Sequence, residues 1–367
     1  MTAKTQSPTC GVTTTSSSSH ARILIVDDCS TYRRLVRSVL DDISQAEVIG
    51  EAKDGIEAVE LAERLKPDIL LLDVEMPGLD GIEVLAELRK RKSASKSIML
   101  SSLTKRGAEP TTEALMEGAF DFIHKPMSDS WEESSIILRS ELLSKLGAYR
   151  QAKRPSSTAS RQPEAPAASR PRTAIDAVCI GASTGGPNAL KQLLADLPGS
   201  LPFPILIAQH MPPHFTASMA KSLDKNCELQ VQEAVDDMPV EKGNVYVAPG
   251  GRQMGVERRS LSNIRICVDD GSPEMAFRPS VNYLFRSAAA TFGPKLFGVI
   301  LTGMGCDGSE GAGDIRDRGG RIFVQDSASC AVDGMPSSAR NAGVVDATAT
   351  LDTIAEEIRA LGLISAI

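Results

Sequence analysis

The sequence has few aromatic residues, no excess of positive charge and no long apolar run, and each absence excludes a class of protein. Aromatic residues make up 4% of the 367 residues, which argues against a surface that stacks nucleic-acid bases. The formal net charge of −7 also provides no basic surface for DNA or RNA. No apolar stretch approaches the roughly 20 residues of a membrane span. We therefore expect neither a nucleic-acid partner nor membrane insertion.

Cysteine pairs and a secretion signal are missing as well. The seven cysteines are odd in number, scattered along the chain and never spaced as Cys-x-x-Cys. This pattern is typical of reduced thiols in the cytosol rather than of a disulfide framework. Residues 1–21 are polar and lack the apolar core of a signal peptide. We interpret them as a disordered tail on a cytoplasmic protein.

The chain does contain two stretches of apolar-patterned sequence, separated by a compositionally biased segment. Residues 151–172 read QAKRPSSTASRQPEAPAASRPR, with almost no bulky apolar side chain. Such a segment buries too little surface to fold, so we predict a flexible linker over residues 147–173. It separates a first domain at residues 22–146 from a larger second domain at residues 174–364.

Both domains have the pattern of a doubly wound α/β fold. In the first, short apolar runs alternate with helix-period stretches such as STYRRLVRSVLDD, which predicts a parallel sheet covered by helices on both faces. The second domain alternates in the same way. Ligands of such sheets bind at the carboxyl ends of the strands. The predicted strands of the first domain lie at residues 22–26, 47–52, 68–72, 97–100 and 121–124.

Polar residues stand at those carboxyl ends. Asp27 and Asp28 follow the first predicted strand, Asp73 the third, Ser101 the fourth and Lys125 the fifth. Three converging carboxylates repel one another, and oxygen ligands with room for water suit Mg²⁺. A lysine and a hydroxyl beside them suit a phosphoryl group. Each residue alone is typical of an ordinary strand end, but the five together predict a site.

The motifs LIVDDCST, LLLDVEMPGLDG, IMLSS and HKP resemble those of the response-regulator receiver domain, which has a flavodoxin-like fold. The resemblance implies that Asp73 accepts a phosphoryl group from a histidine kinase. It also implies that Asp28 and Asp73 are the main Mg²⁺ ligands, with the backbone carbonyl of Glu75 as a further ligand and Asp27 acting through water.

Three further receiver positions follow from the same resemblance. Ser101 and Lys125 match the phosphate-sensing positions. Phe122 falls at the position of the family's aromatic switch residue, although a buried core phenylalanine remains the alternative interpretation. Phosphorylation is then expected to shift one face of the domain between two states.

Near the start of the second domain, the stretch IGASTGGP contains the pattern G-x-S-x-G around Ser183. A strand precedes it and a helical pattern follows, the context in which this pattern exposes a nucleophilic hydroxyl. A phosphate-binding loop would need a lysine after the glycines, and a dinucleotide-binding loop would need glycine at 183. A serine here also suits a helix N-cap, and that interpretation stays open on the loop alone.

A nucleophilic serine needs a base and a residue that orients the base. His210 ends the apolar run PILIAQH, and two prolines separate it from His214, which weakens a shared metal site. Asp307 lies in the glycine-rich turn after LFGVIL, where capping of the following helix is the alternative. We expect Ser183, His210 and Asp307 to meet at the carboxyl ends of one parallel sheet. Their chain order differs from that of the α/β-hydrolases.

The motifs IGASTGG, QHMP, YVAPGGRQM and LTGMGCDG resemble the catalytic domain of the chemotaxis protein-glutamate methylesterases, a Rossmann-like α/β esterase domain. The resemblance implies that Ser183 is the nucleophile, His210 the general base and acid, and Asp307 the residue that orients His210. Thr184 and Met304 match positions near the oxyanion site, although Met304 also suits simple packing.

The implied activity is hydrolysis of glutamyl γ-methyl esters on methyl-accepting chemotaxis receptors, and deamidation of receptor glutamines. No cofactor is expected for this reaction, and phosphorylation of Asp73 is expected to activate it. Cys306 has no evident base or helix N-terminus and is not expected to be a second nucleophile. A rival hypothesis is a non-catalytic adaptor that binds an anionic partner through its glycine-rich loops.

Overall fold

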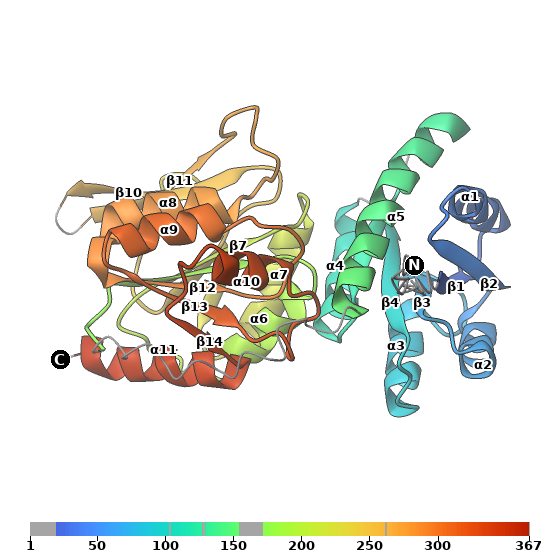
Figure 1. Ribbon diagram of the computed structural model, residues 1–367, viewed down its shortest axis with the longest axis horizontal. Helices are drawn as coiled ribbons and strands as arrows, with labels where there is room; N and C mark the ends of the chain where they lie inside the picture. Colours follow the sequence, from blue (N-terminus) through green and yellow to red (C-terminus); the bar gives the residue numbers. More distant parts are fainter. Residues whose placement is uncertain are drawn as a thin grey trace, which may run out of the picture.

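The computed structural model describes two α/β domains side by side (Figure 1). Residues 1–19 of the predicted tail and most of the predicted linker fall outside the described residues, and the first strand begins at Ala21, the last residue of the predicted tail. Helix α5 (Trp131–Lys153) continues past residue 146, where the sequence predicts the linker to begin. The structure describes residues 20–102, 104–126, 128, 130–153, 172–260 and 263–366.

The first domain has a five-stranded parallel sheet in the order β2-β1-β3-β4-β5. Helices α1 and α5 cover one face, and α2, α3 and α4 cover the other. This is the predicted flavodoxin-like, doubly wound arrangement. Its strands are β1 (Ala21–Val26), β2 (Ala46–Ala52), β3 (Ile69–Asp73), β4 (Lys96–Ser102) and β5 (Asp121–Lys125). Its other helices are α1 (Ser30–Asp41), α2 (Gly55–Leu65), α3 (Gly81–Lys90) and α4 (Lys105–Met116).

Local sequence explains these elements. Every residue of β3, ILLLD, is buried, as expected for a central parallel strand covered on both faces. Helix α3 begins with a capping box, in which Asp80 accepts from the amide of Glu83 and Glu83 accepts from the amide of Asp80.

The second domain has a seven-stranded parallel sheet in the order β14-β13-β12-β6-β7-β9-β8. Helices α6, α7 and α11 pack on one face, and α8, α9 and α10 on the other. Its strands are β6 (Ala177–Ala182), β7 (Ile205–Gln209), β8 (Gln230–Glu233), β9 (Asn244–Val247), β12 (Leu296–Ile300), β13 (Arg321–Gln325) and β14 (Ala347–Ala349). Its helices are α6 (Gly186–Ala195), α7 (Phe215–Asn226), α8 (Val281–Phe292), the 3₁₀ turn η1 (Gly293–Lys295), α9 (Ser309–Asp317), α10 (Gly334–Asn341) and α11 (Leu351–Ser365).

An antiparallel ribbon of β10 (Gln253–Ser260) and β11 (Asn263–Asp269) packs on α8. Within the large sheet, Ala182 pairs with Gln209 and Ile300 pairs with Gly181. This register aligns the carboxyl ends of β6, β7 and β12. Because the chain order reverses between β6 and β12, these ends form a topological switch point, where ligands of such sheets bind.

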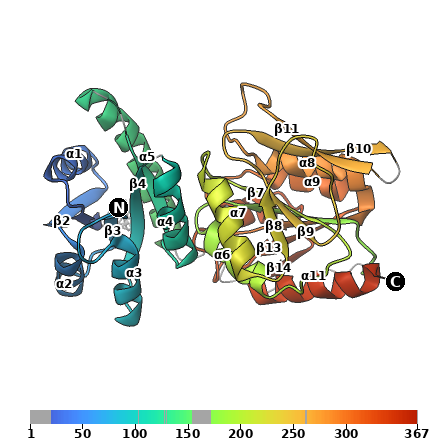
Figure 2. The same cartoon turned by 180° about the vertical axis from the view of Figure 1, so that it is seen from behind.

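The domains meet where α4 faces α6 and α7, and both views agree on this arrangement (Figure 1, Figure 2). Phe122 of β5 stacks on Phe215 of α7, with ring centroids 4.8 Å apart. Lys191 of α6 pairs with Glu117 just after α4, at 2.9 Å. Across the described part of the chain, no helix combines the length and apolar character needed to cross a bilayer.

Candidate active site and phosphorylation site

Ser183 lies in the turn between β6 and α6, half-buried. Its amide donates to the carbonyl of Thr302 at 3.0 Å, and its carbonyl accepts from the amide of Gly186 at 2.7 Å. The N-cap of α6 is Gly185, whose φ of +78° favours glycine, so the interpretation of Ser183 as the helix cap is wrong. A Cβ at Gly186 would lie 1.9 Å from Oε1 of Gln209. The turn therefore needs its glycines and leaves the Ser183 hydroxyl at the start of a helix.

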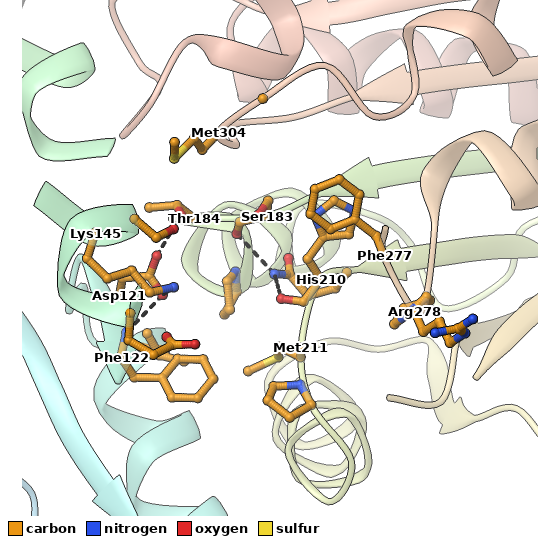
Figure 3. Close-up of a pocket in the computed structure, with 18 of the residues that line it drawn as sticks. Asp121, Phe122, Lys145, Ser183, Thr184, His210, Met211, Phe277, Arg278 and Met304 are labelled. Carbon is orange, nitrogen blue, oxygen red and sulfur yellow. Dashed lines mark hydrogen bonds and ion pairs between the residues drawn. The ribbon is translucent and has the colours of Figure 1, made fainter. Parts of the chain in front are cut away.

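His210 follows β7, with its side chain 11% exposed. Its amide donates to the carbonyl of Ala182 at 3.0 Å, which places it beside the end of β6. Its Nε2 lies 2.7 Å from Oδ2 of Asp307. One face of the imidazole stacks on Phe277, with ring centroids 4.4 Å apart and planes 7° from parallel (Figure 3). The ring is thus fixed at one nitrogen and on one face.

Asp307 is buried and surrounded by donors. Besides His210, it accepts from the Ser280 hydroxyl at 3.0 Å and from the amides of Val281 and Asn282 at 2.7 and 3.0 Å. Burial alone would raise the pKa of this carboxyl, but its bonds with His210 and these amides hold the pKa below its ordinary value. Asp307 therefore stays ionised beside His210. It meets the first amides of α8 rather than capping the following helix, α9, whose N-cap is Gly308.

The structure thus brings Ser183, His210 and Asp307 to three aligned strand ends, as predicted. Among the described residues, no hydrogen bond joins the Ser183 hydroxyl to the His210 ring. The ring nitrogen that remains for Ser183 is Nδ1, because Nε2 faces Asp307. Catalytic hydrogen bonds often tighten only when substrate binds.

A cavity of about 560 Å³ opens at Ser183 and His210, between the two domains (Figure 3). The first domain contributes Asp121, Phe122 and Lys145, among others, and the second contributes Thr184, Phe277 and Met304.

Thr184, next to the candidate nucleophile, donates its hydroxyl to Oδ2 of Asp121 at 2.5 Å. Lys145 of α5 contacts Oδ1 of the same carboxylate at 3.0 Å. Met304 is 37% exposed and lies near α5, since a Cβ at Gly147 would be 3.6 Å from its Cε. The sequence does not predict the contacts of Asp121, Lys145 and Phe277, because these residues lie outside the recognisable motifs of either domain.

At the other end of the first sheet, carboxylate oxygens of Asp27, Asp28 and Asp73 lie within 4.8 Å of one another. Asp27 and Asp73 are buried, and Nζ of Lys125 lies 2.8 and 2.7 Å from them. Burial raises the pKa of Asp73 to about 6, with Lys125 opposing the rise and Asp27 adding to it. Ser101 is buried nearby and accepts from the hydroxyl of Thr111 at 2.6 Å.

This cluster fits Mg²⁺. Three hard oxygen donors converge, and the cavity of about 230 Å³ beside them is lined by Asp28, Asp73, Glu75, Ser101 and Lys125, among others. Glu75 is exposed, and its backbone amide hydrogen bonds with the Asp73 carboxylate. Phe122 is not part of the cluster. It lies 8% exposed at the domain interface instead.

Together, these features define a class of protein: a receiver-type domain joined to an α/β domain with serine, histidine and aspartate at its strand ends. Residues 23–131 match the family model of the response regulator receiver domain, and residues 178–358 match that of the CheB methylesterase. The chain belongs to the CheB methylesterase family.

Relatives of known sequence or structure agree. The chain is 40% identical to a protein-glutamate methylesterase/protein-glutamine glutaminase of Desulfotalea psychrophila, over 92% of this chain and 97% of that protein. It is 38% identical to protein-glutamate methylesterase/protein-glutamine glutaminase 1 of Vibrio cholerae, with the same coverage. The crystal structure of the Thermotoga maritima CheB methylesterase catalytic domain matches with a TM-score of 0.50 and 38% identity. It covers 52% of this chain and 100% of that one.

Proposed function

We propose that this chain hydrolyses glutamyl γ-methyl esters on methyl-accepting chemotaxis receptors, with Ser183 as nucleophile, and that phosphorylation of Asp73 activates the reaction. The observation that carries the proposal is the meeting of Ser183 with the His210–Asp307 pair at one switch point of the sheet. A receptor substrate and a histidine kinase phosphodonor are in keeping with the names of the relatives and the receiver match.

A role for each ring nitrogen of His210 is part of the proposal. Asp307 holds the Nε2–H, so Nδ1 takes the proton from Ser183 as Oγ attacks the ester carbonyl. The start of α6 favours the negative charge that develops on the carbonyl oxygen. Methoxide then leaves with the proton from His210, as methanol.

Water completes the cycle. His210 accepts its proton as the hydroxide attacks the acyl-enzyme, and returns that proton to Ser183 as the bond to Oγ breaks. The sum is one ester and one water giving one carboxylic acid, which ionises, and one methanol. The same steps on a glutamine side chain release ammonia. No cofactor takes part in these steps.

Regulation is proposed to pass along β5. At its carboxyl end, Lys125 contacts the phosphoacceptor Asp73, with Ser101 nearby. The same strand carries Asp121 and Phe122, which contact Thr184 and Phe215 of the second domain. A phosphoryl group on Asp73 would draw Lys125 and Ser101 toward it and loosen the contacts made by β5. Mg²⁺, held by Asp27, Asp28, Asp73 and the Glu75 carbonyl, would neutralise phosphoryl oxygens.

We further propose a cytoplasmic protein with a tail at 1–21, a receiver at 22–146, a linker at 147–173 and an esterase at 174–364. The part of α5 beyond 146 makes the start of that linker helical. Thr184 and Met304 are proposed to border the oxyanion site, since both line the cavity at Ser183.

The test is methanol release from methylated receptor membranes by the wild type and by Ser183→Ala. Loss of a triad serine lowers the rate by about 10⁶-fold, so release by the wild type alone is expected. Receptor binding by both proteins without methanol release from either would instead support the adaptor hypothesis.

A further inference from the structure

The cavity at Ser183 stays open although the two domains are in contact. Its volume of about 560 Å³ lies within the roughly 300–1,000 Å³ typical of small-molecule sites. Ser183, His210 and Phe277 form one side, and Asp121, Ser144 and Lys145 of the receiver form the other. The receiver therefore roofs the candidate active site without filling it.

A receptor helix does not fit beneath that roof. A helix with its side chains is about 10–12 Å wide, and receptor signalling helices are bundled with others. Around Ser183, Thr184 is bonded to Asp121 of the receiver, and Phe122 is stacked on Phe215. These contacts must separate before a helix bundle reaches the serine. A molecule the size of one amino-acid residue needs no such separation.

We propose that the resting, unphosphorylated protein hydrolyses small γ-methyl esters of glutamate within this cavity, so that the receiver gates by substrate size. The inference rests on the proposed esterase function. It adds a substrate class to that function. It also limits the role of phosphorylation to controlling access of the protein substrate, because Ser183, His210 and Asp307 would be able to catalyse hydrolysis in the resting protein.

The charges on the cavity walls balance, which favours an uncharged ester. Lys145 and Asp121 pair at 3.0 Å. The other acidic and basic side chains that line the cavity, Glu141 and Arg278, carry opposite formal charges. Phe277 and Met304 add exposed apolar surface, at 43% and 37%. A suitable probe is N-acetylglutamate γ-methyl ester α-methylamide, which presents the receptor's reactive group without its helix.

The first experiment compares two substrates with the full-length protein. Methanol release is measured from this probe and from methylated receptor membranes, each with and without phosphodonor and Mg²⁺. We expect phosphodonor to raise release from membranes by about tenfold or more, and release from the probe by less than about twofold, because only the first requires the open population.

The possible results distinguish a failure of this inference from a failure of the proposed esterase function. Equal stimulation on both substrates would overturn the inference, and so would release from membranes with none from the probe. Release from neither substrate would overturn the proposed function itself. Ser183→Ala, inactive on both, is the control for contaminating esterases.

Two exposed serines on α5 offer a matched pair of variants. Ser144 lines the cavity, whereas Ser140, one turn earlier on the same helix, does not. Ser144→Trp should occupy the cavity and lower probe hydrolysis about tenfold in the resting protein, with recovery on phosphodonor. Ser140→Trp should match the wild type.

Equal probe hydrolysis by the two tryptophan variants would overturn the route through the cavity. Membrane methanol release without phosphodonor should stay low in Ser144→Trp. A higher rate of methanol release from membranes would mean that the tryptophan separates the domains instead of filling the cavity. If probe hydrolysis then also became faster than in the wild type, the result would contradict the inference, because the receiver would have been limiting access of the small ester as well.

Discussion

At the end of the first sheet three carboxylates lie close together and two of them pair with one lysine, whereas in the second domain a single carboxylate is surrounded by donors. Burial raises the pKa of Asp73 to about 6, while His210 and the backbone amides of Asn282 and Val281 hold the pKa of Asp307 below its ordinary value. The first environment suits a group whose charge is to be changed by modification. The second suits a charge that stays constant while a neighbouring histidine gains and loses a proton.

Among the variants that alter these two sites, the largest loss of activity is expected when the charge of Asp307 is removed. Asp307→Asn should lower methanol release by about 10⁴-fold, because an amide no longer fixes Nε2–H or stabilises the imidazolium. The measurement is methanol release from methylated membranes, with phosphorylation of Asp73 monitored alongside. Phosphorylation should be unchanged. A comparable loss of phosphorylation would show that the two sites are not chemically separate.

A smaller effect should come from the residue that ties the sites together. Asp121→Ala removes the acceptor of Thr184 and the partner of Lys145, so unphosphorylated protein should release methanol from membranes several-fold faster, about 3- to 30-fold. Glu109→Ala is the control, because its pair with Lys221 spans the same interface but is widely exposed at 3.8 Å. Equal rates for both variants would place the restraint elsewhere.

The stack on His210 should matter less than its bond to Asp307. Phe277→Ala is expected to lower kcat about 2- to 10-fold, the range for loss of one ring pair, while Phe277→Tyr should retain activity. A fall in kcat at an unchanged KM would show that the ring acts through His210. A raised KM with an unchanged kcat would assign Phe277 to substrate contact instead.

The smallest effect concerns stability at low pH. The pKa of Asp307 is lower in the folded than in the unfolded chain, so its stabilising contribution is full above its ordinary pKa of 3.8 and is lost as pH falls through the folded pKa. The difference in free energy of unfolding between wild type and Asp307→Asn should therefore shrink below pH 4, by at most about 1.4 kcal/mol per pH unit. Urea titrations between pH 3 and 6 measure this. A difference in free energy of unfolding that did not change with pH would contradict the lowered pKa of Asp307.

The fold class and the positions of most of the candidate site residues could be predicted from the sequence, because parallel strands bring their carboxyl ends together irrespective of loop conformation. The positions of Asp73 and Ser183 follow from that rule together with one motif for each residue. The contacts of Asp121, Lys145 and Phe277 do not follow from it. They depend on how the two domains pack and on how a distant loop folds back over the site, which no local sequence pattern encodes.

The end of α5 could not be predicted from composition either. The composition of residues 147–153 predicts a flexible linker, yet these residues are helical. Tyr149 is buried and donates to Asp68 at 2.8 Å, and Lys153 contacts the same carboxylate. The roles assigned to the site residues stay predictions, as do the domain boundaries.

Control of the esterase by Asp73 is tested most directly by the response of methanol release to phosphodonor and Mg²⁺ in full-length wild type and Asp73→Ala, on methylated receptor membranes. We expect strong stimulation of the wild type, and an Asp73→Ala protein that keeps the resting rate and does not respond. Equal stimulation of the two proteins would contradict it, because the signal would then not begin at Asp73.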